Sequence, residues 1–241
     1  MKGKGDGKFN EAYCFQTGSN QWKTYDTWPP KKAVTKKLYA APNNKASFNA
    51  PAAATGYSSY TSDPAHPVPY RALPIEATYG PGSRWKPWQM EDQRFVTTRP
   101  DVLNFTMDSL VKDLTVTGPI TAHLFASTSG TDADWVVKLI DVYPDFDPDN
   151  KLMSGYQLPV AMEVIRGRFH KSFEKPEALV PNQPTAFTID LHNINHTFKK
   201  GHRIMIQVQS TWFPVIDRNP QKFVPNIFEA KESDFIKAEQ R

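Results

Sequence analysis

The sequence is poor in features that would fix its chemistry or its surroundings at once. It has a single cysteine, Cys14, so no disulfide can form within the chain and no zinc site can be built from cysteines. No apolar run approaches the roughly 20 residues that a membrane-spanning helix needs. The first ten residues, MKGKGDGKFN, lack the apolar centre of a signal peptide and read like a chain cut from a longer one. We therefore expect no membrane span, and these residues assign no compartment.

Catalytic motifs are missing as well. The pairs Ser129-Gly130 and Gly82-Ser83 lack the flanking glycines of the G-x-S-x-G turn that presents a nucleophilic serine. None of the six histidines stands in a zinc-binding spacing, and His192 and His196 are expected in an ordinary loop. There is no G-x-G-x-x-G sequence and no phosphate-binding loop. Taken alone, the sequence predicts no catalytic residue, no metal site and no cofactor.

A large excess of one charge is also absent. The 29 lysines and arginines accompany 25 acidic residues, and this mixed surface argues against a nucleic-acid partner. The 21 prolines favour a loop-rich β protein, because proline is disfavoured inside helices and tolerated in loops and at strand edges. The segment 41–91 is rich in Pro, Ala, Ser and Gly and has little periodicity. We expect this segment to wrap a surface or to contact a partner.

Most of the remaining sequence has the two-residue period of β-strands. The expected strands are AYCFQTG, KKAVTKKLYAA, FVTTRPDVLNFT, two strands in DLTVTGPITAHLFAST divided at Gly118-Pro119, DWVVKLIDVY, TAFTIDLHNI and HRIMIQVQST. In TAFTIDLHNI we expect Phe187 and Leu191 to be buried, and in HRIMIQVQST we expect Gln207 and Gln209 to face water. Helices are expected in the C-terminal EAKESDFIKAEQ and, more weakly, near ALPIEA. This pattern predicts an all-β sandwich or jelly roll with long irregular loops and one or two short helices.

The stretch TSGTDADWVVKLIDVYPD, residues 128–145, has carboxylates on both sides of an apolar run. Asp132 and Asp134 precede the run, and Asp141 and Asp145 end or follow it. The functional interpretation is an acid/base pair, and the structural one is a buried strand with polar ends. We favour the structural interpretation, because aspartate is common in turns, where it hydrogen-bonds the nearby backbone.

The segment DFDPDN, residues 145–150, has the acidic spacing that begins a calcium-binding loop. However, Asn150 and Tyr156 stand where such a loop needs glycine and glutamate. A turn between strands is therefore favoured over a calcium site.

Two polar and aromatic clusters stand out, EDQRFVTTRPDVL at 91–103 and FPVIDRNP at 213–220, the latter directly after a tryptophan. Their candidate site residues are Arg94, Arg99, Asp101, Trp212, Phe213, Asp217, Arg218 and Asn219. Arginine and aspartate can form bidentate pairs that fix loops in place. The clusters form either a ligand site or contacts between loops or domains. We favour the contacts, because backbone groups at the ends of a sandwich need polar partners.

The order of several blocks carries a resemblance. The blocks are TGSNQWKTYDTWPP, SDPAHPVPY, EDQRFVTTRPDVLNFT, VTGPITAHLFASTSGTDADWVVKLIDVYP, RGRFHKSFE and HTFKKGHRIMIQVQSTWFPVIDRNPQ. Nearly the whole chain resembles the C-terminal part of the serine hydrolases that include X-prolyl dipeptidyl peptidases and cocaine esterase. Within that group it is similar above all to the α-amino-acid ester hydrolases and glutaryl-cephalosporin acylases.

The resemblance implies a division of labour. In that family an α/β-hydrolase domain carries the Ser-Asp-His triad, and a jelly roll of the galactose-binding-like type follows it. No position here matches the triad, so no catalytic residue is carried over. Residues 1–30 would lead in from the end of a hydrolase domain, and residues 31–241 would form the jelly roll, including the wrapping segment 41–91. The parent would hydrolyse amino-acyl or X-Pro esters or amides, and the relatives are often exported.

The implied role of this chain is to dock on the α/β-hydrolase domain, to wall one side of the active-site entrance and to contribute contacts in a homo-oligomer. The alternative is a carbohydrate-binding module, because jelly rolls of this type often bind sugars. Its stacking rings would be Trp85, Trp88, Trp212 and Phe213. We favour burial of these rings, since large aromatic side chains dominate cores and interfaces.

Overall fold

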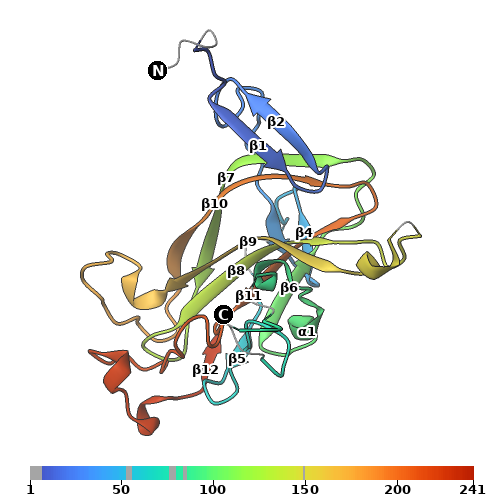
Figure 1. Cartoon of the computed structure of the whole chain (residues 1–241). Helices are drawn as coiled ribbons and strands as arrows, with labels where there is room; N and C mark the ends of the chain where they lie inside the picture. The colour runs from blue at the N-terminus through green and yellow to red at the C-terminus, as the bar shows by residue number, and fades with distance from the viewer. Residues whose placement is uncertain (1–6, 53–55, 76–79, 84–85, 149) are drawn as a thin grey trace.

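The computed structural model describes residues 7–52, 56–75, 80–83, 86–148 and 150–241, and its regular structure is mostly β-strand (Figure 1). The strands are β1 (Ala12–Gln16), β2 (Gln21–Tyr25), β3 (Tyr39–Ala41), β4 (Lys45–Ser47), β5 (Tyr60–Ser62), β6 (Val102–Thr106), β7 (Leu114–Ala126), β8 (Asp134–Val142), β9 (Gln157–Arg166), β10 (Thr185–Phe198), β11 (Arg203–Gln209) and β12 (Ala238–Gln240). The helical elements are short, namely α1 (Arg94–Thr97) and the 3-10 turns η1 (Trp88–Met90), η2 (Lys151–Met153), η3 (Gly167–Phe169), η4 (Ile227–Glu229) and η5 (Glu232–Asp234). No helix within the described ranges is long and apolar enough to cross a membrane.

The main core lies between two layers of strands. The larger layer is a six-stranded sheet in the order β3-β4-β6-β11-β8-β9, and the other is the long antiparallel pair β7–β10. Apolar side chains from both layers meet between them, including Trp135 of β8, Phe187 and Leu191 of β10, and Val208 of β11. The rings of Trp135 and Phe187 lie 4.3 Å apart between centroids. The expected burial of Phe187 and Leu191 on one face of their strand is confirmed.

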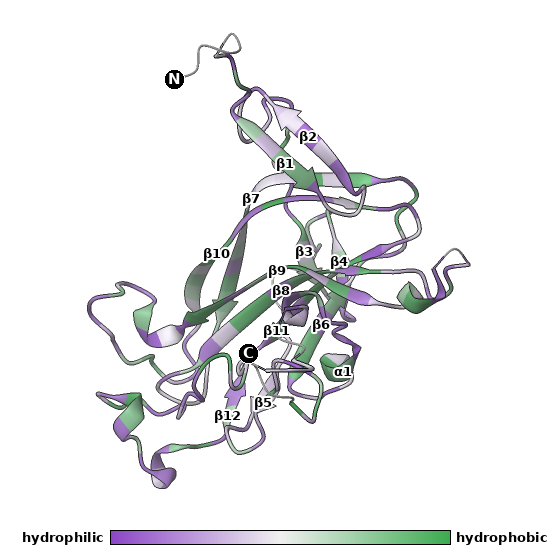
Figure 2. Cartoon of the chain, viewed as in Figure 1, coloured by the Kyte–Doolittle hydropathy of each residue, from purple (hydrophilic) through white to green (hydrophobic). Residues whose placement is uncertain are grey.

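The second face of the six-stranded sheet is also covered, which the strand pattern did not predict. Tyr70, Val136 and Trp212 form a further buried group, to which Trp88 of η1 contributes. Strand β8 is therefore buried along both faces, and Figure 2 shows mainly hydrophobic residues along it. The expectation that the glutamines of β11 face water is wrong, because irregular segments cover that face.

Strand β7 is continuous through Gly118-Pro119, so the expected division into two strands is wrong. The irregularity lies in the partner strand β10. There the register of the β7–β10 pairing shifts between Asp190 and Asn193, opposite this point. Gly118 has a φ of +110°, and a Cβ there would lie 2.8 Å from the Pro29 side chain. The glycine therefore bends the strand against a close neighbour instead of ending it.

Four further expectations about secondary structure need correction. The C-terminal helix is absent, because the described chain forms η4, η5 and then β12, which pairs with β5. Of the expected strand at 31–41, only Tyr39–Ala41 forms, and the start of the stretch expected at 95–106 belongs to α1. Near ALPIEA, residues 72–75 form no helix and residues 76–77 lie outside the described ranges. The C-terminal error arose because pairing with the distant strand β5 makes Ala238–Gln240 a strand.

Candidate functional site

Two aspartates at the start of strand β8 are almost completely buried, namely Asp134, its first residue, and Asp132, two residues before it. Asp134 accepts hydrogen bonds from Arg166 Nε at 3.2 Å, Arg166 Nη2 at 3.1 Å and Asn219 Nδ2 at 2.8 Å. Asp132 accepts one from Arg168 Nε at 2.7 Å. Burial raises the pKa of Asp134 to about 6, although Arg166 and Asn219 act in the opposite direction. Both carboxylates have fixed partners, which supports the interpretation of polar strand ends over that of an acid/base pair.

The other end of β8 buries Asp141 between two histidines. His196 Nε2 lies 3.1 Å from Oδ2, and His202 Nδ1 lies 2.8 Å from Oδ1. Burial acts to raise the pKa of Asp141, but hydrogen bonds from the two histidines outweigh it and hold that pKa below its usual value. The expectation of an ordinary loop for His192 and His196 is wrong, because β10 continues through both, and His196 is almost fully buried. The signal in the sequence was a second two-residue alternation, Ile194, His196 and Phe198, which is one residue out of phase with Leu191.

Thr17 adds a hydroxyl to this cluster, since its Oγ1 lies 2.7 Å from His196 Nδ1. The resulting order of hydroxyl, imidazole and carboxylate resembles that of serine hydrolases. However, the imidazole is buried and the carboxylate is shared with a second histidine. The backbone of Thr17 also bonds β10, by Thr17 N to Asn195 O at 3.0 Å and Thr197 N to Thr17 O at 2.9 Å. These contacts attach the chain after β1 to β10, and they present no nucleophile to a cleft.

Lys138, in the middle of β8, is completely buried. Its Nζ donates to Gln93 Oε1 at 2.8 Å and lies 5.7 Å from the ring centroid of Trp212. Burial lowers the pKa of Lys138 to about 7. A lysine with such a pKa is suited to act as a base or a nucleophile, but only if a substrate can reach it.

The first predicted cluster forms local ion pairs. Arg99 binds Asp101 in a bidentate manner, with Nε at 2.8 Å and Nη2 at 2.7 Å. Arg99 Nη2 also donates to the backbone oxygen of His66 at 2.9 Å. Arg94 pairs with Asp92 two residues earlier. Arg99 thus connects the start of β6 to the wrapping segment.

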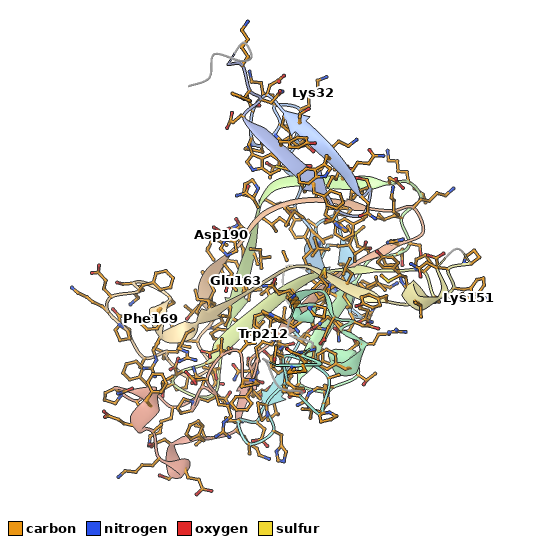
Figure 3. The ribbon with its side chains drawn as sticks, viewed as in Figure 1. Lys32, Lys151, Glu163, Phe169, Asp190 and Trp212 are labelled. Atoms are coloured by element: carbon orange, nitrogen blue, oxygen red, sulfur yellow. The ribbon has the colours of Figure 1, made fainter. Side chains whose placement is uncertain are left out.

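The aromatic members of the second cluster divide between core and surface. Trp212 is 6% exposed and packs with Tyr70 and Trp88 inside the molecule, as Figure 3 shows for Trp212. Phe213 is 38% exposed, and the guanidinium of Arg218 lies 5.7 Å from its ring centroid. A sugar-stacking role needs exposed ring faces, and Trp212 has none.

The polar members of the second cluster contact two separate regions. Arg218 Nη1 donates to the backbone oxygen of Pro64 at 3.1 Å. The backbone oxygen of Asp217 accepts from Arg166 Nη2 at 3.1 Å, and Asn219 binds the first strand end described above. The two predicted clusters therefore do not converge on one cleft. They reach the same short segment, because Arg99 and Arg218 both donate to backbone oxygens between residues 64 and 66.

Two other candidates lie outside the described residues, namely Trp85 and Asp149. Of the remaining acidic residues in the calcium-like stretch, Asp145 pairs with Arg203 at 2.7 Å, and Asp147 accepts a backbone hydrogen bond from three residues later at 3.1 Å. Within the described part of the chain, no group of three or more His, Cys, Asp or Glu residues is arranged to hold a metal ion. The contacts of this stretch are those of a turn.

Two of the hollows on the described surface can be compared with the buried groups of β8. One, of about 420 Å³, lies beside β4 and β6, and its polar lining includes Asn44, Asn104 and Asp108. The other, of about 520 Å³, lies between the β1–β2 hairpin and β10, and its lining includes Cys14 and Trp28. The buried aspartates, the buried histidines and the buried lysine of β8 line neither hollow. The groups suited to acid/base chemistry thus lie outside these two hollows.

Comparisons with known proteins give a consistent assignment. Residues 11–233 match the family described as the X-Pro dipeptidyl-peptidase C-terminal non-catalytic domain. Cocaine esterase of Rhodococcus sp. (strain MB1 Bresler) is 29% identical over 216 residues, which are 85% of this chain and 34% of that protein. A putative serine esterase of Mycobacterium bovis is 26% identical over 228 residues, covering 85% of this chain and 33% of that protein.

Two solved structures share the fold and nearly half of the sequence. An aminopeptidase from a marine sediment archaeon, Thaumarchaeota archaeon, has a TM-score of 0.94 and 46% identity, and the match covers 96% of this chain and 38% of that one. An α-amino acid ester hydrolase has a TM-score of 0.89 and 47% identity, with 95% and 38% covered. The chain thus spans about a third of the length of its curated relatives. Because the family match extends over most of its residues, the chain belongs to the family of X-Pro dipeptidyl-peptidase C-terminal non-catalytic domains.

Proposed function

We propose that this chain docks on an α/β-hydrolase domain, walls one side of its active-site entrance and contributes contacts between copies in a homo-oligomer. The main support is an asymmetry of coverage. The solved relatives match 95–96% of this chain, but this match accounts for only 38% of their own length. An aminopeptidase and an ester hydrolase therefore share this unit in addition to a much larger remainder. We infer that the remainder carries the chemistry.

The parent protein, by this proposal, hydrolyses an amino-acyl or X-Pro ester or amide through a serine acyl-enzyme. The identities of 46% and 47% to an aminopeptidase and an α-amino acid ester hydrolase support this substrate class. Within the parent, residues 1–30 lead from the hydrolase domain into the β domain of residues 31–241.

The β domain itself is proposed to be a jelly roll of the galactose-binding-like type. A six-stranded sheet facing the pair β7–β10 around one core supports this assignment. The carbohydrate-binding alternative has less support, because Trp212 is buried and the aromatic group around it is part of a second core.

Arg99 and Arg218 are proposed to stabilise the loops at one end of the domain. Both donate to backbone oxygens of the wrapping segment, at 2.9 Å and 3.1 Å. Backbone groups of an irregular segment need such partners, because an unpaired buried carbonyl destabilises the fold. A well-ordered segment would in turn offer the hydrolase domain a fixed surface.

Activity of the isolated chain tests the non-catalytic assignment directly. Incubation with an activated ester, such as p-nitrophenyl acetate, is expected to give the rate of buffer alone. The matched variant is Thr17→Ala, which removes the hydroxyl beside His196. Turnover well above buffer that a serine-type inhibitor abolishes, or that Thr17→Ala removes, would contradict the proposal.

A further inference from the structure

The β1–β2 hairpin exposes three aromatic rings on one of its faces. Tyr13, Phe15 and Trp22 are 65%, 42% and 59% exposed, and Phe15 stands opposite Trp22 across the hairpin. The rings of Tyr13 and Trp22 stack with centroids 4.8 Å apart, and Phe15 meets Trp22 edge-on at 5.5 Å. We call these three residues the hairpin aromatic face. Figure 1 shows the hairpin projecting from the rest of the molecule.

The hairpin is held in one orientation although it projects. Gln16 Nε2 and Tyr25 OH both donate to Asn195 Oδ1 of β10, at 3.0 Å and 3.1 Å. Gly18, which follows β1, packs tightly against β10. A Cβ at this position would lie 2.0 Å from the backbone oxygen of Thr197. A lone two-stranded hairpin is marginally stable in water, so these contacts to β10 give it a fixed position. The aromatic face is thus preorganised for binding.

The exposed area of the hairpin aromatic face is that expected for the central part of a protein interface. Because a large aromatic side chain contributes roughly 150–250 Å², the exposed fractions together amount to roughly 300 Å² of mainly apolar surface. A stable protein interface buries about 800 Å² on each partner. Another exposed ring, Phe173, also stacks, but its centroid lies 6.1 Å from that of Phe169, against 4.8 Å between Tyr13 and Trp22. Aromatic clusters of this kind supply most of the binding energy at the middle of protein interfaces.

The geometry of the rings favours a protein over a sugar as the partner. Tyr13 and Trp22 are nearly parallel, at 19°, and each covers one face of the other. Phe15 is turned by 67° relative to Trp22. Sugar rings stack on open ring faces, and the mutual stacking of Tyr13 and Trp22 covers one face of each ring. The apolar ring edges, the Tyr13 hydroxyl and the Trp22 indole N–H can contact a protein surface that has both apolar and polar groups.

We propose that the hairpin aromatic face docks on the hydrolase domain of the parent protein. This inference rests on the proposed function and assigns one docking surface within it. The family match begins at residue 11, so β1 and β2 lie at its start, within the segment proposed to lead in from the hydrolase domain. In the solved relatives, 38% of the chain belongs to this unit, and the larger remainder is available to cover the face. A second copy of this chain is the other occupant that the experiment distinguishes.

Binding in trans tests the assignment. The probe is the part of the α-amino acid ester hydrolase relative outside the match, produced as a separate protein whose folding is first verified by circular dichroism. The hairpin variant is Tyr13→Ser/Phe15→Ser/Trp22→Ser, and the matched control is Val111→Ser/Phe125→Ser/Phe228→Ser, three exposed apolar residues elsewhere. Titration calorimetry is expected to show at least a hundred-fold loss of affinity for the hairpin variant and less than a three-fold change for the control. Slower amide exchange in residues 12–25 of the unmodified chain on adding the probe is a second expected result that needs no variant.

The other outcomes separate the two proposals. Equal affinity of the unmodified chain and the hairpin variant would overturn this inference and leave the proposed docking function intact. Failure of every chain to bind the folded probe would overturn both. If light scattering shows that the unmodified chain dimerises, the hairpin variant is monomeric, and both bind the probe equally, the face serves self-association and the inference is wrong.

Discussion

The two ends of strand β8 bury carboxylates with different partners. At the first end, Asp132 and Asp134 bind the guanidinium groups of Arg168 and Arg166. At the second end, Asp141 binds the imidazole rings of His196 and His202. The pKa of Asp134 is raised because burial dominates there, whereas the pKa of Asp141 is lowered because two imidazole donors outweigh burial. The hydrogen-bond partners of each carboxylate, together with its burial, thus decide whether its pKa is raised or lowered.

The middle of the strand differs from both ends. Lys138 is as deeply buried as the aspartates, but its partners are an amide oxygen and an aromatic ring. Lys138 has no ion-pair partner among the described residues. Burial therefore destabilises its charged form and lowers its pKa to about 7. The comparison of the ends with the middle leads to three predictions.

Removing an arginine from the first end is expected to have the largest effect. Arg168→Met leaves Asp132 buried without its guanidinium partner, which should lower the free energy of unfolding by about 3–5 kcal/mol. Urea unfolding at pH 7 measures the change. The matched control is Arg203→Met, whose partner Asp145 has a side chain 84% exposed, and it should cost less than about 1 kcal/mol. Equal effects of the two substitutions would show that burial does not distinguish these ion pairs.

Replacing the lysine in the middle is expected to stabilise the fold at low pH. The pKa of Lys138 is about 7 in the fold and about 10.4 when unfolded, so between these values the unfolded chain binds more protons and stability rises with pH. Lys138→Met removes this dependence. It should add about 3 kcal/mol at pH 6, after allowing for the hydrogen bond lost by Gln93, and progressively less towards pH 9. Urea unfolding at both pH values gives the difference, and a gain that does not depend on pH would contradict the explanation.

Replacing one aspartate at each end should separate two pH ranges. With its pKa raised to about 6, Asp134 holds a proton in the fold that the unfolded chain has released, so stability falls by about 2 kcal/mol between pH 4 and pH 7. Asp134→Asn should remove this fall. The pKa of Asp141 is lowered, so its contribution is present above pH 4 and is lost as pH decreases further, and Asp141→Asn should remove that loss. Denaturation measured from pH 3 to pH 8 tests both, and identical pH profiles for the two variants would show that the ends do not differ.

Parts of the fold were predictable because they depend on local pattern. Phe187 and Leu191 alternate with polar residues along a strand with one buried and one exposed face, and the structure agrees. Gln207 and Gln209 alternate equally well, but both are completely buried. The strand period indicates which residues share a face and not whether a second layer covers that face. Similarly, the C-terminal segment has the composition of a helix, but pairing of Ala238 with Ser62 makes its end a strand.

The candidate site shows the same division. From the sequence alone came the absence of a nucleophile turn, the resemblance to the C-terminal part of a serine hydrolase family, and the interpretation of Asp132 and Asp134 as polar ends of a buried strand. Which charges are buried, and which groups neutralise them, was decided by the tertiary structure. The partners of Asp134 are Arg166 and Asn219, which stand 32 and 85 residues away along the chain. Local sequence sets the direction of a side chain, whereas its dielectric environment and its ion-pair partners exist only after distant segments have packed together.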